Sequence, residues 1–157
     1  EELTKSFFPN KQFSVQNNNL NISFINDRND LIEKTNEDMR QAKSETCFIV
    51  SGLEVPAETI LENKKAIDRG IRIRMIVQNL NETKKEMLKN WQKIGIEVRY
   101  YPSIEARMII FDSNIVYITS YNPGEKEEGR GARFNYLPIA IQIKELFESR
   151  WKSSKPL

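Results

Sequence analysis

The chain has 157 residues, a length that fits one domain, and its 24 basic and 22 acidic residues leave a net charge of +2. That charge is too small to predict nucleic-acid binding by this segment. The absence of histidine removes the commonest general base and the commonest transition-metal ligand, so we expect no metal site and no cofactor.

The apolar runs are much shorter than the roughly 18 residues that a membrane-spanning helix needs. The lone cysteine, Cys47, offers no disulfide framework, which suits a reducing compartment. We therefore expect a cytoplasmic protein without a membrane partner. The first residues include neither an initiator methionine nor a signal peptide, which favours a fragment of a longer chain or a processed one.

The polar residues 1–21 predict an irregular N-terminal segment, and residues 22–157 predict the folded domain. The first hundred residues then alternate between two patterns. Four segments have the apolar composition of strands: 22–25, 46–52, 71–77 and 96–101. Three segments have helical periodicity: 26–45, 56–69 and 82–94. The order predicts an α/β fold with a mixed, mostly parallel sheet flanked by helices.

The helix boundaries follow from capping residues. Asn29 or Asp30 can cap the first helix, Pro56 suits the first turn of the second, and Asn81 can cap the third. We expect the second helix to end at Gly70. Its predicted apolar face consists of Ala57, Ile60, Leu61 and Ile67.

The last third of the chain begins with a hairpin, residues 105–122, that turns at residues 112–114. Residues 123–133 have the glycine-rich, charged composition of a mobile loop. The apolar residues 134–143 predict a final strand, and 144–154 a terminal helix.

Four polar residues of the hairpin are candidate ligand-binding residues. By strand alternation, Glu105 and Arg107 share one face, and Ser120 and Asn122 share one face of the next strand. We expect all four to lie near one end of the sheet. A simpler interpretation is an exposed Glu–Arg pair, which contributes little to stability, beside a turn that favours Asp112 for its conformation alone.

The spacing of these residues resembles the signature of the phospholipase D superfamily. That signature is His-x-Lys, four residues, Asp, six residues, Gly-Ser-x-Asn. The corresponding positions here hold Glu105 and Arg107, then Asp112, then Ser120 and Asn122 after a threonine. The helix, Arg-Gly turn and strand at residues 64–77 and the segment 145–151 resemble the same superfamily, so the likeness extends over about residues 22–152.

The resemblance implies a half-size domain with one motif instead of two. In the superfamily a histidine attacks the phosphodiester, and here Glu105 occupies its position. A carboxylate is anionic at neutral pH and repels a phosphodiester, so we expect no catalytic residue and no enzymatic activity. Single-motif members pair their half-sites, which implies a homodimer.

Within the superfamily, the pattern is most similar to the effector-sensing domain of TrmB-type transcriptional regulators. This similarity implies a non-catalytic sensor and dimerisation domain that binds a small polar effector, a sugar or an organic anion, through Glu105, Arg107, Ser120 and Asn122. DNA would be bound only by a domain outside this sequence.

Several alternatives remain open at this level. Similar domains serve as input domains of sensor histidine kinases, and the domain could be a purely structural interaction module without a ligand. An altered enzyme could use Glu105 with Asp112 or Glu128 for acid–base chemistry. Arg72, Arg74 and Arg99 could form a basic face for nucleic acid, although solvated strand arginines are the more common case.

Overall fold

The computed structural model describes residues 20–51, 55–102, 106–120 and 129–157. Within these ranges the elements are, in chain order, β1 (Asn21–Ile25), α3 (Arg28–Gln41), β2 (Glu45–Val50), α4 (Ala57–Asp68), β3 (Arg72–Val77), α5 (Glu82–Lys93), β4 (Glu97–Tyr100), β5 (Arg107–Phe111), β6 (Ile115–Thr119), β7 (Gly131–Asn135), α6 (Leu137–Ser153) and β8 (Lys155–Pro156). The α/β fold expected from the sequence is confirmed.

One mixed sheet forms the middle layer, in the strand order β1-β7-β6-β5-β2-β3-β4-β8. Parallel pairing is confined to its β2-β3-β4 part, where α4 and α5 make the crossovers. The sheet is mixed as expected, but the expectation that it is mostly parallel is wrong, because the other strand pairs are antiparallel. The strand β5 joins β2 in antiparallel pairing, and β6, β7 and β1 extend the sheet from there. The carboxyl ends of β2 and β3 therefore lie at the same edge of the sheet as the start of β5.

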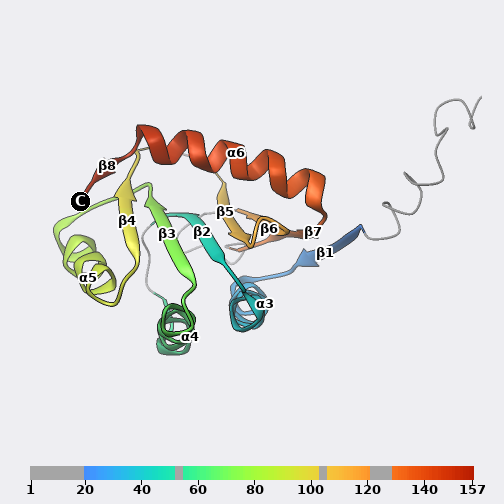
Figure 1. The fold of residues 1–157 in the computed structure, drawn as a ribbon, viewed down its shortest axis with the longest axis horizontal. Helices are drawn as coiled ribbons and strands as arrows, with labels where there is room; N and C mark the ends of the chain where they lie inside the picture. Colours follow the sequence, from blue (N-terminus) through green and yellow to red (C-terminus); the bar gives the residue numbers. More distant parts are fainter. Residues whose placement is uncertain (1–19, 52–54, 103–105, 121–128) are drawn as a thin grey trace, which may run out of the picture.

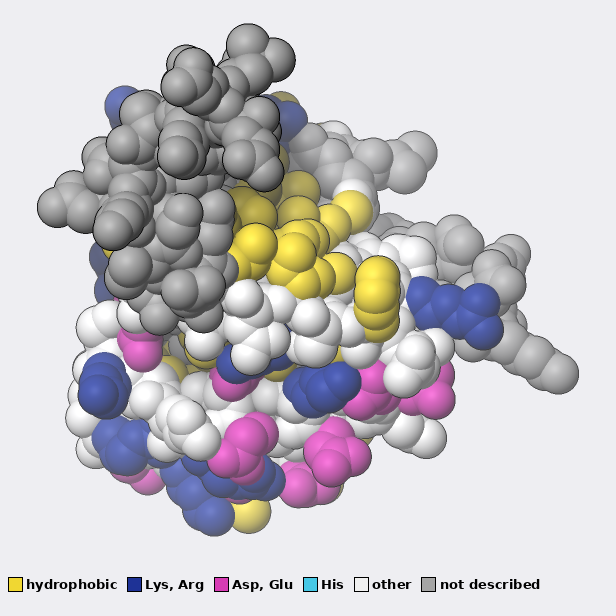
Figure 2. Space-filling view, turned by 90° about the vertical axis from the view of Figure 1, so that its right-hand side faces the viewer, with side chains coloured by type: hydrophobic (Ala, Val, Ile, Leu, Met, Phe, Trp, Pro, Cys, Tyr) yellow, Lys and Arg dark blue, Asp and Glu magenta, His cyan; other side chains and the backbone are white. Residues whose placement is uncertain are grey.

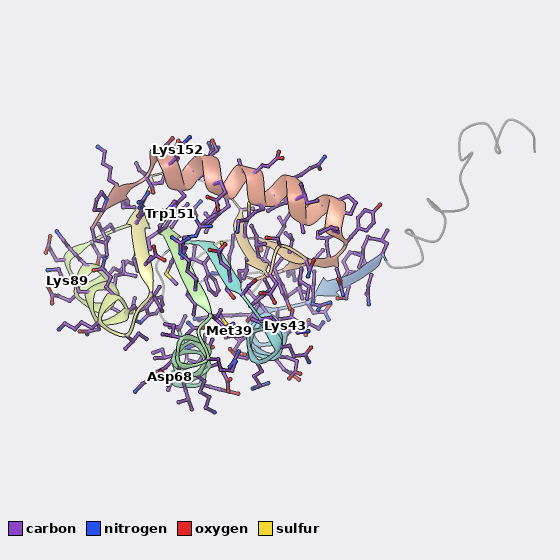
Figure 3. All side chains as sticks on the ribbon, in the orientation of Figure 1. Met39, Lys43, Asp68, Lys89, Trp151 and Lys152 are labelled. Carbon is purple, nitrogen blue, oxygen red and sulfur yellow. The ribbon has the colours of Figure 1, made fainter. Side chains whose placement is uncertain are left out.

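Helices cover both faces of the sheet. Figure 1 shows α3, α4 and α5 on one face and the long α6 crossing the other. Each face of the sheet has its own apolar core. Met39 of α3 belongs to one core and Trp151 of α6 to the other, on opposite sides of the sheet (Figure 3). None of the helices in the described ranges is long and apolar enough to cross a membrane.

The predicted cap of the first helix is wrong by two or three residues. Asp27, and neither Asn29 nor Asp30, is the N-cap, and its carboxylate accepts a hydrogen bond from the backbone N–H of Asp30 at 2.8 Å. The carboxylate of Asp30 accepts a hydrogen bond from the backbone N–H of Asn26, so Asp27 and Asp30 accept from different backbone N–H groups. The cap that Asn81 provides for α5 is confirmed.

The predicted apolar face of α4 is also wrong. Ala57, Ile60 and Leu61 are exposed, and Ile67 alone of the four packs against the core. The helix instead buries Glu62, Asn63 and Ala66. The cause is tertiary, because the Glu62 carboxylate meets the Arg40 guanidinium of α3 at 3.3 Å, and an ion pair between helices cannot be read from the periodicity of one helix.

At the C-terminal end, the final strand and helix begin earlier than expected. The strand β7 ends at Asn135, and residues 137–143 belong to α6 instead of continuing the strand. Pro138 lies in the first turn of α6, where its missing N–H costs no intrahelical hydrogen bond. Of the irregular segment expected for residues 1–21, only Leu20 and Asn21 are described, and Asn21 already belongs to β1.

Candidate functional site

Arg107, one of the four candidate ligand-binding residues, is half-buried at the start of β5. Because β5 runs antiparallel to β2, with Met108 opposite Ile49, Arg107 lies at the carboxyl end of β2. Ligands of open α/β sheets bind outside this end of the strands. Glu105 and Asn122 lie outside the described residues.

The strand register places Arg107 directly beside Thr119 of β6, a residue that the sequence analysis did not select. Opposed residues in an antiparallel pair point to the same face, so Thr119 and Arg107 share the face that α3 covers. Thr119 is only 2% exposed, and its Oγ1 has no hydrogen-bond partner among the residues that the structure describes. Ser120 follows β6 at the same end of the sheet, where its backbone N–H donates to the carbonyl of Arg130 at 2.7 Å.

Asp112, the acidic residue of the motif, lies at the opposite end of β5 and serves the fold. Asp112 lies five positions beyond Arg107 along the extended strand, a distance of about 17 Å. Its carboxylate accepts hydrogen bonds from the backbone N–H groups of Lys43, Ser44 and Glu45 and from the Ser44 hydroxyl, at 2.8 to 3.1 Å. Burial acts to raise the pKa of Asp112, but these bonds outweigh it and hold that pKa below its usual value. Asp112 therefore serves the fold, and its expected acid–base partner Glu105 lies outside the described residues, as does Glu128, the other candidate.

A cavity of about 90 Å³ lies between α3, α4 and the sheet, and Arg107 is part of its wall. We call it the α3–α4 cavity. Most of its walls are apolar, and its lining residues are Arg28, Leu31, Ile32, Thr35, Phe48, Val50, Ser51, Val55, Pro56, Thr59, Asn63, Met75, Trp91, Arg107 and Ile109. A largely apolar pocket with a few convergent polar groups is the usual form of a small-molecule site.

Two hydroxyl groups of this cavity lack partners. Neither Ser51 Oγ nor Thr59 Oγ1 has a hydrogen-bond partner in the described part of the chain, and Ser51 is 2% exposed. Arg28 and Arg107 add two positive charges, and no acidic residue contributes to the described lining. Ser51 is not among the residues predicted from the sequence, although a polar residue that directly follows a buried parallel strand is a signal that could have identified it.

On the same face of the sheet, a buried hydrogen-bond network connects α3 to β6 and β7. The Tyr117 hydroxyl donates to the Asp38 carboxylate, which also receives two hydrogen bonds from Arg133, at 2.8 and 2.9 Å. Burial and the hydrogen bond to Asp38 both raise the pKa of Tyr117, so its hydroxyl remains a donor at all ordinary pH values. The network fixes α3, one wall of the cavity, against the sheet.

The opposite face carries a charged cluster beneath α6, formed by Glu45, Arg74, Lys144 and Glu148. Arg74 is 4% exposed and donates to Glu45 at 3.0 and 3.1 Å and also to Glu148. Burial acts to raise the pKa of Glu45, but the hydrogen bonds from Lys144 and Arg74 lower it to about 2. The cluster is a closed ion-pair network, and it faces away from the α3–α4 cavity.

The proposed basic face of Arg72, Arg74 and Arg99 does not form. Arg74 is buried, Arg72 pairs with Glu97 at 2.6 and 2.9 Å, and Arg99 donates to the carbonyl oxygen of Trp151 at 2.8 Å. The Arg99 guanidinium also lies 4.2 Å from the centre of the Trp151 ring. The interpretation of Arg74 as a solvated strand arginine is likewise wrong, because the glutamates beneath α6 compensate its buried charge.

Across the described ranges, no three His, Cys, Asp or Glu side chains are grouped so that they could hold a metal ion. Cys47, the one cysteine, is 1% exposed, and burial raises its pKa to about 12. A thiol with that pKa is not a nucleophile at neutral pH. What the described residues offer is therefore a largely apolar cavity with two arginines in its wall.

Comparison with known proteins identifies the family and the fold. The family described as "Cardiolipin synthase, PLD-like domain" matches residues 35–131. Among solved structures, TrmBL2, an archaeal chromatin protein whose structure is described as showing a novel mode of DNA binding, has a TM-score of 0.70 at 18% identity. The likeness covers 87% of this chain but only 54% of TrmBL2. No curated protein matches the chain in sequence.

Two further structures are similar over nearly their whole length. NucT from Helicobacter pylori has a TM-score of 0.69 at 11% identity, with 88% of this chain and 98% of NucT covered. Nuc from Salmonella typhimurium, a phospholipase D family member, has a TM-score of 0.67 at 15% identity, with 88% and 97% covered. At these identities the likeness establishes the fold alone.

Proposed function

Since this chain belongs to the family of phospholipase D-like domains, we propose that it is a non-catalytic ligand-sensing and dimerisation domain of a TrmB-like transcriptional regulator. The observation that carries the proposal is the α3–α4 cavity, with Arg107 of the family motif in its wall and no histidine in the chain. The fold shared with TrmBL2 supports it. DNA would be contacted by a part of the full protein outside this chain.

The chemistry of the motif positions supports a binding role. Without histidine the chain cannot form the phosphohistidine on which the superfamily's reaction depends. Arg107 replaces the ammonium of the motif lysine with a planar guanidinium, which suits two-point recognition of a carboxylate, a phosphate or sugar hydroxyls. Arg107, together with Glu105, Ser120 and Asn122, would thus hold an effector without transforming it.

An exposed apolar surface supports dimerisation with a second copy of the chain. We call it the β1–α6 patch and define it by four residues that are 47 to 76% exposed: Ile22, Phe24, Leu137 and Ile141. Figure 2 shows apolar side chains gathered on the face of the molecule that carries β1. Monomeric proteins seldom expose contiguous apolar surface of this kind, and β1 is an edge strand that can accept a partner.

Ligand sensing is tested by thermal unfolding in the presence of sugars, phosphates and organic acids. A ligand at about 100 times its dissociation constant adds about 2.7 kcal/mol of stability, a shift of about 5–10 °C for a domain of this size. We expect Arg107→Ala to remove most of that shift. Arg72→Ala is the matched control, because Arg72 is a strand arginine that pairs with Glu97 away from the cavity. A screen without any shift would instead favour a purely structural module.

Dimerisation is tested by sedimentation velocity across micromolar concentrations. The unchanged chain should sediment as a dimer, and Phe24→Ser should convert it to a monomer. Leu61→Ser is the control, because Leu61 is 49% exposed on α4, outside the patch. A wild-type monomer at high micromolar concentration would count against the dimer. The sensor-kinase alternative shares both expectations and differs only in the domain attached to the full-length chain.

A further inference from the structure

We propose that the α3–α4 cavity binds a short-chain monocarboxylic acid, with its alkyl tail in the cavity and its carboxylate at the N-terminus of α4. The inference deepens the proposed function, because it names the chemical class of the effector and rests on the cavity being the sensing site. The binding itself can be measured without any knowledge of the output domain.

The interior of the cavity sets the size and polarity of the tail. Much of its wall consists of apolar side chains from α3, β2, β3, α5 and β5, namely Leu31, Phe48, Met75, Trp91 and Ile109. A volume of about 90 Å³ holds about three groups of the size of a water molecule or a methylene. A sugar has a hydroxyl on almost every carbon, and these walls could not satisfy them.

The start of α4 supplies donors for the carboxylate. Pro56 is the N-cap of α4 and makes no side-chain capping bond, so the first-turn N–H groups have no partner from a cap. Pro56 and Thr59 both line the cavity, which places the positive end of the helix dipole there. Such a terminus attracts an anion.

Two buried hydroxyl groups of the cavity wall are an independent observation that favours a hydrogen-bonding ligand at this place. Ser51 Oγ and Thr59 Oγ1 are both buried in the cavity wall, and neither has a hydrogen-bond partner among the described residues. A buried hydroxyl without a hydrogen bond costs stability, so two of them in one cavity favour an acceptor that occupies it. A carboxylate has two oxygens and four lone-pair sites, which is enough for both hydroxyls and a helix N–H.

Two arginines in the cavity wall favour an anion over a cationic ligand. Arg28 and Arg107 contribute to the lining, and among the described lining residues none is acidic. Inorganic phosphate carries the charge but has no tail to fill the apolar interior. A carboxylic acid with a tail of about three carbons satisfies the volume, the walls and the charge together.

Butyrate is the probe, and its neutral analogue butyramide is the matched control. Isothermal titration of the whole chain should show butyrate binding at least about tenfold more tightly than butyramide, because only the acid carries the charge. Glucose and inorganic phosphate should give no heat under the same conditions. Equal affinity for acid and amide, or binding of glucose or phosphate in place of butyrate, would overturn the inference.

Two substitutions locate the binding. Ser51→Ala should weaken butyrate binding at least about fivefold. The ligand-free protein should be no less stable, because the hydroxyl has no hydrogen-bond partner among the described residues. Ser153→Ala, on the exposed end of α6, should change neither quantity. Val55→Phe should fill the cavity and abolish binding. Unchanged binding in Ser51→Ala would overturn the proposed site, even if Val55→Phe did not fold.

The outcomes separate this inference from the proposed function. If butyrate binds but the activity of the full regulator does not change, the proposed carboxylic-acid site is supported and the proposed sensing function is contradicted. A thermal shift with another class of compound, without butyrate binding, would retain sensing and reject the carboxylic acid.

Discussion

The carboxylate of Asp112 holds the backbone N–H of Ser44 at 2.8 Å, although the two residues are 68 positions apart in the chain. Asp112 lies in the turn after β5 with a φ of 54°, and Ser44 lies just before β2. The acidic residue of the phospholipase D motif therefore fixes the loop that leads into the central strand. Its presence in the motif is explained by the fold, independently of any reaction.

Replacing Asp112 with alanine should lower the free energy of unfolding by about 2–4 kcal/mol, because three backbone N–H groups and a hydroxyl lose a charged acceptor. Asp112→Asn should lose less, because asparagine tolerates a positive φ and keeps one acceptor oxygen. Urea unfolding measures both. Asp68→Ala, at an exposed position, should stay within about 0.5 kcal/mol of the wild type. A similarly small effect at Asp112 would contradict the structural role.

Acid should destabilise the domain through Glu45. Its pKa is lowered from 4.5 to about 2 in the folded protein, so its contribution is complete above pH 4.5 and is lost as the pH falls toward 2. Linkage makes that contribution about 3 kcal/mol. Urea unfolding from pH 7 to pH 2 should show the decline, and Glu45→Gln should flatten it. An equally steep decline in Glu45→Gln would assign the effect to other carboxylates.

Cys47 should not react with Ellman's reagent in the native protein at pH 8. Its side chain is 1% exposed, and its pKa of about 12 leaves almost no thiolate. In urea the thiol should react completely, and the rate at intermediate urea should report unfolding. Ser153→Cys, at an exposed position of α6, is the positive control and should add one thiol that reacts immediately. Rapid labelling of the native wild type would contradict the burial of Cys47.

The chain should not hydrolyse bis(p-nitrophenyl) phosphate above the rate of a buffer blank. It lacks the histidine nucleophile of the superfamily, and Asp112 is fully engaged by donors at the other end of β5. Release of p-nitrophenol is followed by absorbance, with Glu105→Ala as the variant that removes the carboxylate at the histidine position. Hydrolysis by the wild type that disappears in Glu105→Ala would show altered catalysis.

The sequence indicated the order of strands and helices correctly as far as α6, because apolar periodicity and capping are local; the short strand β8 was not predicted. The apolar run at residues 46–52 predicts the buried strand β2, and Asn81 caps α5 as expected. The spacing from Arg107 to Asp112 and Ser120 was enough to suggest the superfamily, and the matched family confirms it. Sequence patterns failed where the partner of a side chain lies far away in the chain.

For this protein, the sequence by itself determined an α/β domain of the phospholipase D-like family that lacks the histidine of that family's reaction. Only the tertiary structure decided that Asp112 anchors the start of β2 and that Arg74 is buried among glutamates. It also decided that α4 turns Asn63 and Thr59 inward while Leu61 remains exposed. The physical reason is that burial of a polar group depends on partners contributed by distant segments. Periodicity within one segment carries no information about those partners. The α3–α4 cavity is lined by segments that are distant from one another in the chain.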